Sequence, residues 1–411
     1  MSAQRVVARA YGDPEIRDLV NTRPVSVVAV GKAAAAMAMA FVKIEGPVLR
    51  QAVAIGTHAE AIGRSIEWIE SSHPFPDSRS EHAALRALAV AGSVRPEEVL
   101  LVLLSGGASA LMSAPIDGLT LEEKVRTTRL MMEAGADIHA LNTVRRHLSR
   151  VKGGRLAAAC PGLTVTLAIS DVIGDDLNAI GSGPSVPDAT TWVDAADALS
   201  RFAGVEAYPA SVRAVLRRGL SGELPDTPKP GDAVFARSVA RVIGSRIDAI
   251  AGARAAASER GYYPIVIADP VKGEARQVAL DWWARVQMLI ASAPRPVCVI
   301  SAGETTVRVT GGGKGGRNLE FGLALAQTVS AHPGLVAGAS VGTDGIDGSS
   351  GVAGAIVDST TMGRVRQAGL DSPGRYLDAN DSSAFFAPLG DQIELGRTDT
   401  NVGDLQVFLF Q

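Results

Sequence analysis

At 411 residues the chain is too long for one ordinary hydrophobic core, so we expect two domains. Hydrophobic residues make up 46% of the chain but aromatic residues only 4%, a composition that suits parallel strands covered by alanine-rich helices. The formal net charge of −3 argues against a general affinity for nucleic acid or for anionic membranes.

The composition also bears on the compartment. The two cysteines, Cys160 and Cys298, lie in apolar surroundings without metal-ligand spacing, as is typical of a reducing compartment. No apolar run approaches the roughly 18 residues of a membrane span, and the N-terminal residues lack the apolar core of a signal peptide. We therefore expect a cytoplasmic protein without a membrane partner.

The first strong strand signal is the apolar run at residues 25–30, which is followed by Gly31 and an alanine-rich helix. Lys32 falls in the first turn of that helix, where a cation costs several tenths of a kcal/mol unless an anion offsets it. This position favours a lysine directed at a phosphate or carboxylate at the end of the strand. A solvated lysine that tolerates the small cost is the alternative.

A second apolar strand, at residues 99–104, is followed directly by Ser105, Gly106, Gly107 and Ser109. These small residues can offer backbone N–H groups and hydroxyls to an anion. The order G-G-A-S-A does not match the G-x-S-x-G pattern of a nucleophilic serine. We therefore predict an anion-binding loop at this strand end.

A basic segment follows between residues 142 and 155. Its members are Asn142, Arg145, Arg146, Lys152 and Arg155, interrupted by two glycines. Such a run is usually a solvated helix face, but the density of cations and the glycine pair suit an anionic ligand equally well. Both interpretations stay open here.

Carboxylates gather after the apolar strand at residues 163–169. Asp171, Asp175 and Asp176 lie at its end, and three negative charges there are costly without a cation or a proton. Binding of Mg²⁺ or general-base catalysis would explain them. Helix caps and a solvated turn are the alternative.

The composition changes at residues 186–236, where proline and polar residues increase, and PDTPKPGD at 225–232 indicates a boundary. We therefore predict an N-terminal domain at 1–232 and a C-terminal domain at 233–411. The second is expected to open with an alanine-rich helix at 239–260 and to continue the alternation of strands and helices. The pattern predicts two α/β domains whose loops face one crevice.

The glycine-rich stretch at residues 311–316 is the most distinctive part of the second half. It contains Lys314 and is followed by Arg317, and Asn318 lies where a helix cap is expected, before a helical pattern at 319–329. Bare glycines, a helix N-terminus and two cations suit a multiply charged phosphate. A flexible hairpin turn is the alternative.

Further carboxylates flank this stretch. Glu304 follows the apolar run at residues 297–300, and Asp344 and Asp347 form a pair in a glycine-rich loop after a predicted strand at 336–341. Such a pair suits a metal ion. We therefore expect the second half to contribute carboxylates as well as cations.

The chain lacks a complete form of the two common nucleotide-binding motifs. The chain lacks G-x-x-x-x-G-K-[ST], so it is not a P-loop NTPase. Gly311, Gly313 and Gly316 formally satisfy G-x-G-x-x-G, but the acidic residue expected about 20 residues later to hold a ribose is absent. Cations within the loop suit a terminal phosphate better than a dinucleotide pyrophosphate.

Segments along nearly the whole chain together resemble one known family. They read, in order, VGKAAAAMA, HPFPD, LSGGASALM, LNTVRRHLSRVKGGRLA, SDVIGDDLNAIGSGPSVPD, SAGETTVRVTGGGKGGRNLEF, GTDGIDGSSGVAGA and TNVGDLQVFL. They resemble the glycerate 2-kinases with a C-terminal MOFRL domain. The resemblance implies ATP-dependent phosphorylation of D-glycerate to 2-phosphoglycerate with a divalent metal ion. Family members are often named hydroxypyruvate reductase.

The resemblance also assigns a fold and a site. It implies an α/β protein of two Rossmann-like domains, with mostly parallel sheets and an active-site cleft between them. The family's lysine after the first strand falls on Lys32, its SDV-GD aspartates on Asp171 and Asp175, and its GGRN arginine on Arg317. These four are the predicted catalytic residues. The predicted nucleotide- or substrate-binding residues are Ser105, Gly106, Gly107, Ser109, Asn142, Arg145, Lys152, Glu304, Gly312, Gly313, Lys314, Asn318 and Asp344.

The expected cofactors are ATP and Mg²⁺, with Asp175, Asp344 and Asp347 as candidate metal ligands. D-glycerate is the expected small-molecule partner, and a homodimer is left open. An NAD(P)H-dependent hydroxypyruvate reductase is the rival enzyme, and a non-catalytic sugar-acid binding protein is the rival of another class.

Overall fold

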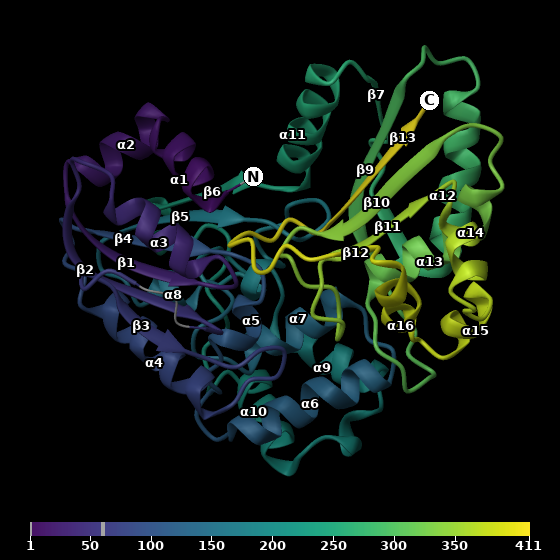
Figure 1. Cartoon of the computed structure of the whole chain (residues 1–411). Helices are drawn as coiled ribbons and strands as arrows, with labels where there is room; N and C mark the ends of the chain where they lie inside the picture. The colour runs from purple at the N-terminus through teal and green to yellow at the C-terminus, as the bar shows by residue number, and fades with distance from the viewer. Residues whose placement is uncertain (1, 59–61) are drawn as a thin grey trace. The chain divides into compact units, whose positions relative to one another are not determined.

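The computed structural model describes residues 2–58 and 62–411 (Figure 1). The chain forms two compact units, Ser2–Ile243 and Gly244–Gln411, and each is described by itself. No described helix is both long and apolar enough to cross a membrane.

Within its described residues, the N-terminal unit is built on a six-stranded sheet in the order β3-β2-β1-β4-β5-β6. Strands β1 to β5 all pair in parallel, with Val25 opposite Val99 and Val30 opposite Leu104 across the β1–β4 pair. Nearly every residue of β1 and β4 is buried, which explains why the sequence shows continuous apolar runs there. The strands are β1 (Pro24–Val30), β2 (Val48–Gly56), β3 (Glu67–Glu70), β4 (Val99–Leu104), β5 (Leu163–Ile169) and β6 (Ser238–Gly244).

Helices of this unit build two hydrophobic clusters. One joins the sheet to α4 (Ser78–Gly92), α5 (Ala108–Leu111) and α8 (Arg155–Ala158). The other joins α6 (Leu121–Glu133), α7 (Ile138–His147), α9 (Trp192–Arg201) and α10 (Ala210–Leu220). The remaining helices are α1 (Ala3–Tyr11), α2 (Pro14–Asn21), α3 (Ala34–Val42) and the short 3₁₀ helices η1 (Ile180–Ser182), η2 (Val205–Ala207) and η3 (Ala233–Arg237).

The region after residue 232 differs from expectation. The predicted helix at 239–260 is wrong in its first part, because residues 238–244 form strand β6, which pairs with β5 in the first sheet. Helix α11 (Arg246–Glu259) begins only after Ser245, whose Oγ accepts the Ile247 N–H at 3.3 Å. The predicted boundary at 232/233 thus falls before a strand of the N-terminal sheet.

The C-terminal unit contains, in its described residues, a mixed seven-stranded sheet in the order β12-β11-β10-β13-β9-β7, with β8 also paired to β9. Only β7 and β8 run parallel to β9, and the other pairs are antiparallel. The expectation of mostly parallel sheets is therefore wrong for this unit. The strands are β7 (Tyr263–Val266), β8 (Val271–Glu274), β9 (Val297–Thr306), β10 (Val336–Gly342), β11 (Gly354–Asp358), β12 (Gln392–Ile393) and β13 (Asp404–Phe410).

The physical reason for the mixed sheet is the place of β13. This last strand lies between β9 and β10 and is antiparallel to both, with Phe408 opposite Val299 on one side and Gly338 on the other. No crossover helix separates β10 from β11, and two strands joined by a loop without a helix pair antiparallel more readily than parallel.

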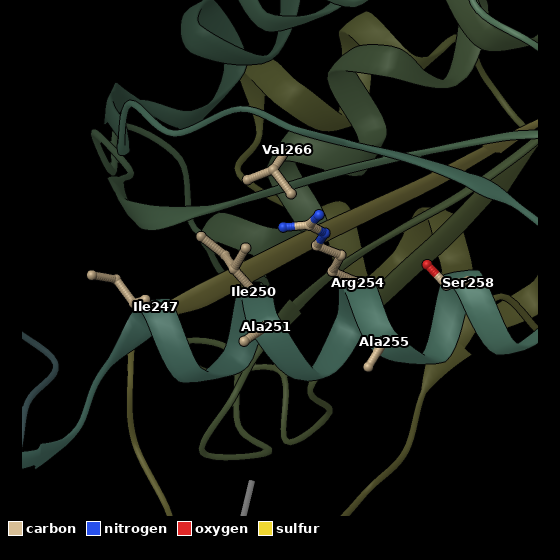
Figure 2. A pocket seen from close by; sticks show the side chains of 7 residues that line it. All are labelled: Ile247, Ile250, Ala251, Arg254, Ala255, Ser258 and Val266. Atoms are coloured by element: carbon tan, nitrogen blue, oxygen red, sulfur yellow. The ribbon is translucent and has the colours of Figure 1, made fainter.

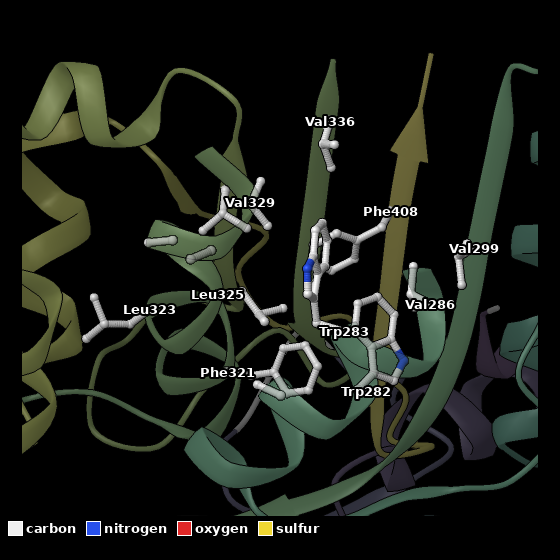
Figure 3. Close-up of a cluster of buried hydrophobic side chains, with 14 of the residues drawn as sticks. Trp282, Trp283, Val286, Val299, Phe321, Leu323, Leu325, Val329, Val336 and Phe408 are labelled. Carbon is white, nitrogen blue, oxygen red and sulfur yellow. The ribbon is translucent and has the colours of Figure 1, made fainter. Parts of the chain in front are cut away.

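Aromatic side chains pack among aliphatic ones in the main core of the C-terminal unit (Figure 3). Trp282 packs with its ring centroid 4.7 Å from that of Phe408 and 5.6 Å from that of Phe321. These residues join α12 (Ala275–Ile290) and α13 (Arg317–Ser330) to the sheet, while α11 contributes to a separate cluster with residues of β9. The remaining helices are α14 (Thr361–Gln367), α15 (Pro373–Asp378), α16 (Ser382–Phe386) and η4 (Ala387–Leu389).

Candidate active site

In the N-terminal unit, the loops after β1 and β4 lie where the strand order reverses. Strand β1 has β2 on one side and β4 on the other, so the connections after β1 and β4 leave the sheet in opposite directions. In parallel α/β sheets, such a point at the carboxyl ends of the strands is the usual ligand site.

Hydrogen bonds link the loops after β1 and β4. The Lys32 N–H donates to the Gly106 carbonyl oxygen at 2.9 Å, and the Ala33 N–H donates to Ser105 Oγ at 3.0 Å. Gly31 has a φ of +126°, and a Cβ there would lie 2.2 Å from Ser105 Oγ, so this contact requires glycine. The predicted residues Lys32, Ser105 and Gly106 are thus brought together.

The side chains of Lys32 and His73 both lie close to Gly107. A Cβ at this residue would lie 3.5 Å from Lys32 Cγ and 3.1 Å from His73 Cδ2. The predicted lysine and the histidine of the HPFPD segment therefore both reach this loop. Sequence reasoning left His73 out of the site, and its only signal was the rigid proline-rich segment around it.

Ser109, Asn142 and Lys152 form one polar network at the end of this loop. Lys152 Nζ donates to the Ser109 carbonyl oxygen at 2.8 Å and to Ser109 Oγ at 3.1 Å, and Ser109 Oγ lies 2.9 Å from Ser182 Oγ. Ser182 Oγ in turn donates to Asn142 Oδ1 at 3.0 Å. Lys152 is fully buried, and burial lowers its pKa well below the usual range. In this geometry Lys152 braces the loop, and direct ligand contact by Lys152 stays a prediction.

The aspartate loop follows β5, the neighbour of β4 in the sheet. Asp171 and Asp175 are half-buried, and Asp175 has a φ of +55°, a left-handed conformation that aspartate and asparagine tolerate better than most residues. Asp176 is exposed and accepts the Asn178 N–H at 2.9 Å, so it has a capping role. The structure thus places the two predicted catalytic aspartates one strand away from the Ser105 loop.

In the C-terminal unit, helix α13 begins at Arg317, with Gly316 as its cap residue. The side chain that caps the helix is Asp347, whose Oδ1 accepts the Asn318 N–H at 3.0 Å and whose Oδ2 accepts the Leu319 N–H at 2.8 Å. A Cβ at Gly316 would lie 2.3 Å from Asp347 Cγ, so glycine permits this approach. The expectation that Asn318 is the cap residue is wrong, because the capping carboxylate comes from a distant loop.

Asn318 instead links the helix to the sheet. Its Nδ2 donates to Asp404 Oδ1 at 2.8 Å, and its Oδ1 accepts from Ser340 Oγ at 2.7 Å. Both contacts are buried. Asn318 therefore serves to hold Asp404, and a ligand contact by Asn318 stays a prediction.

Arg317 is held between two carboxylates. Its Nη1 donates to Glu304 Oε1 at 2.8 Å, and its Nε lies 2.8 Å from Asp404 Oδ2. Burial lowers the pKa of Arg317, but Asp404 and Glu304 outweigh that effect and raise it above the ordinary value. Its Nη2 donates to no residue that the structure describes, so the guanidinium is oriented while one donor nitrogen is available to a ligand.

Asp404 is the main residue that sequence reasoning missed. It is the first residue of β13, and burial raises its pKa to about 6 in spite of the attraction of Arg317. The available signal was a carboxylate at the start of an apolar strand, within the TNVGDLQVFL segment. A buried acid at such a place requires a partner, and that partner is Arg317.

The glycine stretch packs against residues 379–383. The Gly313 N–H donates to the Ala379 carbonyl oxygen at 3.0 Å, and the Lys314 N–H donates to Asp381 Oδ1 at 3.0 Å. A Cβ at Gly313 would lie 2.3 Å from Asp381 Cβ, which explains the glycine there. The binding of phosphate by Gly312, Gly313 and Lys314 stays a prediction.

The predicted metal ligands are Asp175, Asp344 and Asp347, and the structure shows which of their oxygens already accept hydrogen bonds. Among residues 2–58 and 62–411, no group of three or more His, Cys, Asp and Glu side chains could hold a metal ion. Both oxygens of Asp347 accept N–H groups of α13, and Asp344 Oδ1 accepts the Ile346 N–H at 3.2 Å. Mg²⁺ in phosphoryl-transfer sites is commonly held by one or two carboxylates together with substrate phosphates. A single carboxylate such as Asp175 fits that requirement.

Asp347 gives a stability prediction. We expect Asp347→Ala to lower the free energy of unfolding by about 2–4 kcal/mol, because two N–H groups at the start of α13 lose their buried acceptor. Urea unfolding measures this. Asp371→Ala, which removes an exposed ion pair with Arg375, is the control and should change stability by about 0.5 kcal/mol or less. Equal stability of the two variants would contradict the capping role.

A pocket on α11 lies apart from these residues in the C-terminal unit (Figure 2). It contains none of the predicted site residues, and Arg254 is the charged member of its lining. The other lining residues are Ile247, Ile250, Ala251, Ala255, Ser258 and Val266. We assign no function to it.

Comparison with known proteins shows the family of this chain. A model described as a domain of unknown function, DUF4147, matches residues 1–217, and the MOFRL family model matches residues 297–404. A glycerate 2-kinase of Pyrococcus horikoshii is 38% identical over 93% of this chain and 86% of its own length. A D-glycerate 2-kinase of Thermotoga maritima is 35% identical over 95% of this chain and 91% of its own.

Two further matches are informative. A protein of Agrobacterium vitis, provisionally named as a hydroxypyruvate reductase, is 38% identical over 100% of this chain and 95% of its own. A crystal structure of the glycerate kinase from Thermotoga maritima covers 100% of this chain and 98% of its own, with a TM-score of 0.84 and 34% identity. The fold and these matches define a two-domain α/β protein of the DUF4147 and MOFRL type. The chain belongs to the glycerate 2-kinase family, as the resemblance of its segments predicted.

Proposed function

We propose that this protein is an ATP-dependent glycerate 2-kinase, which transfers the γ-phosphoryl group of ATP to the 2-hydroxyl of D-glycerate. Near full-length similarity to two proteins named as glycerate 2-kinases carries the proposal. The arrangement of Arg317 between two carboxylates supports it, because an oriented arginine with one available donor suits the charge of a transferring phosphoryl group.

In the proposed reaction, the glycerate 2-hydroxyl oxygen attacks the γ-phosphorus, and the bond from that phosphorus to the β,γ-bridging oxygen breaks. The hydroxyl proton passes to Asp171 or Asp175, and ADP leaves. Lys32 and Arg317 offset the negative charge of the phosphoryl group and of the glycerate carboxylate, and either cation can serve either anion.

Other residues position the ligands. The Ser105–Ser109 loop, with Lys152 and Asn142 behind it, is proposed to bind phosphate or glycerate oxygens. Asp175 is proposed as a ligand of Mg²⁺, which would supply charge neutralisation of the phosphates.

An activity assay separates this proposal from its rivals. Purified protein is expected to form ADP only when ATP, D-glycerate and Mg²⁺ are all present, and to leave NADH and NADPH unchanged with hydroxypyruvate. Coupled ADP detection and the 340 nm absorbance of the nicotinamides measure the two activities.

Each result that contradicts the kinase proposal favours a different rival function. Oxidation of either nicotinamide with hydroxypyruvate, without ADP formation from glycerate, would favour the reductase. Binding of glycerate without any turnover would favour the sugar-acid binding protein.

A further inference from the structure

Four cationic side chains gather in the N-terminal unit behind the Ser105 loop. Lys124 is only 4% exposed, and its Nζ has one long contact, 3.4 Å from the Ala114 carbonyl oxygen. Arg145 makes no hydrogen bond or ion pair with any residue that the structure describes, and Arg155 Nε and Nη2 are buried without a hydrogen-bond partner there. Only the fourth, Lys152, is fully hydrogen-bonded.

Two carboxylates that act on this cluster, Asp188 and Asp226, have other hydrogen-bond partners. Asp188 and Asp226 attract Arg155 through space, and Glu81 attracts Lys124 more weakly than the neighbouring cations repel it. Asp188 is hydrogen-bonded to the side chains of Arg146, Thr190 and Thr227. Asp226 interacts with the side chains of His147, Thr227 and Lys229. None of the three carboxylates makes an ion pair with Lys124, Arg145 or Arg155 among the described residues.

The cluster is therefore electrostatically unfavourable in the absence of a ligand. Burial lowers the pKa of Lys124 to about 7, and the charges of Arg145 and Arg155 contribute to the shift. Burial also lowers the pKa of Arg145. Buried charges in proteins are normally paired, because the cost of desolvation is otherwise not repaid.

Its location connects this cluster with the candidate active site. Lys152 bonds to Ser109 and Met112, and Lys124 contacts Ala114, so both lysines reach the segment that continues from the loop after β4. An anion among these cations would thus lie beside the phosphate- or substrate-binding loop. No carboxylate of the described residues takes that place.

We propose that Lys124, Arg145 and Arg155 form an oxyanion-binding site that holds a carboxylate or a phosphoryl group, with Lys152 as its brace. The assignment of that oxyanion to D-glycerate or to ATP rests on the proposed function. Guanidinium groups bind both kinds of oxyanion through paired N–H donors.

Calorimetric titration with D-glycerate, ATP and inorganic phosphate tests this. Arg145→Gln and Arg155→Gln are each expected to weaken binding of at least one of the three by about tenfold or more. The ligand that is affected identifies the source of the oxyanion. Arg150→Gln, which changes an exposed arginine at the end of the same segment, is the matched control and should bind like the wild type.

Thermal stability separates binding from a structural role. Arg145 and Arg155 are partly buried and lie among other cations. Removing one of these mutually repelling cations should leave the melting temperature of the ligand-free variants at or above that of the wild type, whereas loss of a structural cation would lower it. Binding of all three ligands within about twofold of the wild type in both arginine variants would overturn the site.

The pH dependence of stability gives a second readout through Lys124. The charged groups that act on it are Arg145 on α7, Arg155 on α8, Glu81 on α4, and Lys152 through their mutual repulsion. Because its folded pKa is lowered from 10.5 to about 7, the unfolded chain binds the extra proton between these values. Stability of the ligand-free protein should therefore rise with pH through this range.

Lys124→Met should remove that rise, and its melting temperature should exceed the wild type most clearly below pH 7. Saturating oxyanion should shift the rise in the wild type to higher pH. A variant that is less stable than the wild type at pH 6, with an unchanged pH profile, would contradict the site.

These outcomes are distinguishable from failure of the proposed function. If the wild type forms no ADP from glycerate and ATP but the arginine variants lose phosphate binding, the kinase proposal fails and the oxyanion site stands. If ADP forms and both variants bind all three ligands normally, the kinase stands and the oxyanion site fails.

Discussion

Arg317→Met is expected to reduce kcat/KM for D-glycerate by about 1000-fold or more, equivalent to roughly 4 kcal/mol of transition-state stabilisation. Arg317→Lys is expected to lose at least about tenfold. Lysine keeps the charge, but a single ammonium cannot bond Asp404 and Glu304 in one plane and still present a separate donor to the ligand. Steady-state kinetics of both variants measure the losses.

Arg276→Met is the matched control for Arg317. Arg276 also forms a partly buried ion pair in the C-terminal unit, with Nε 2.8 Å from Glu320 Oε1. Its loss should affect stability but leave kcat/KM of the folded enzyme within about twofold of the wild type. Near-normal turnover by Arg317→Lys would remove Arg317 from the site.

Asp171→Asn and Asp175→Asn should each fold normally but lose activity by about 100-fold or more. An amide cannot accept the hydroxyl proton and is a weaker ligand for Mg²⁺, while it keeps nearly the same shape. Asparagine also tolerates the left-handed backbone at position 175. Rates measured against Mg²⁺ concentration separate the two roles, since a lost metal ligand raises the Mg²⁺ requirement and a lost base lowers kcat at saturating metal.

Asp176→Asn provides the comparison within the same loop. This carboxylate is exposed and accepts an N–H group of its own turn, a bond that asparagine can also make. Its variant should retain most of the activity. Wild-type rates and metal dependence in both Asp171→Asn and Asp175→Asn would show that the cluster is structural.

Local signals in the sequence predicted the strands of the N-terminal unit and the loops at their carboxyl ends. The apolar runs that became β1, β4 and β5 are buried on both faces, so their sequence is continuous and their ends are marked by glycine, serine or aspartate. Because these strands are parallel neighbours, residues after their carboxyl ends meet at one edge. The strand-end signals place Lys32, Ser105 and Gly106 in adjoining loops, and a ligand-binding role for these residues stays a prediction.

Long-range contacts explain what the sequence did not reveal. The apolar pattern after Asn318 predicts a cap at that residue, whereas the capping oxygen belongs to Asp347, 29 residues later. Arg317 was recognised, but its partner Asp404 is 87 residues away and has no local pattern. The helix predicted at 239–260 is wrong in its first part, because the prediction rested on alanine-rich composition. The Ser245–Asp248 capping box marks the true start of α11.

The position of β13 bears on how the protein is made. Its strand is synthesised after all its sheet partners, yet it lies between β9 and β10, so the second sheet stays divided until residues 404–410 have left the ribosome. The N-terminal sheet, whose strands all precede residue 245, has no such delay. Because β13 also brings Asp404 to Arg317, the ion pair that orients Arg317 forms only after β13 has been made. A nascent chain that stops before β13 would leave two unpaired strand edges exposed and would depend on chaperones to avoid aggregation.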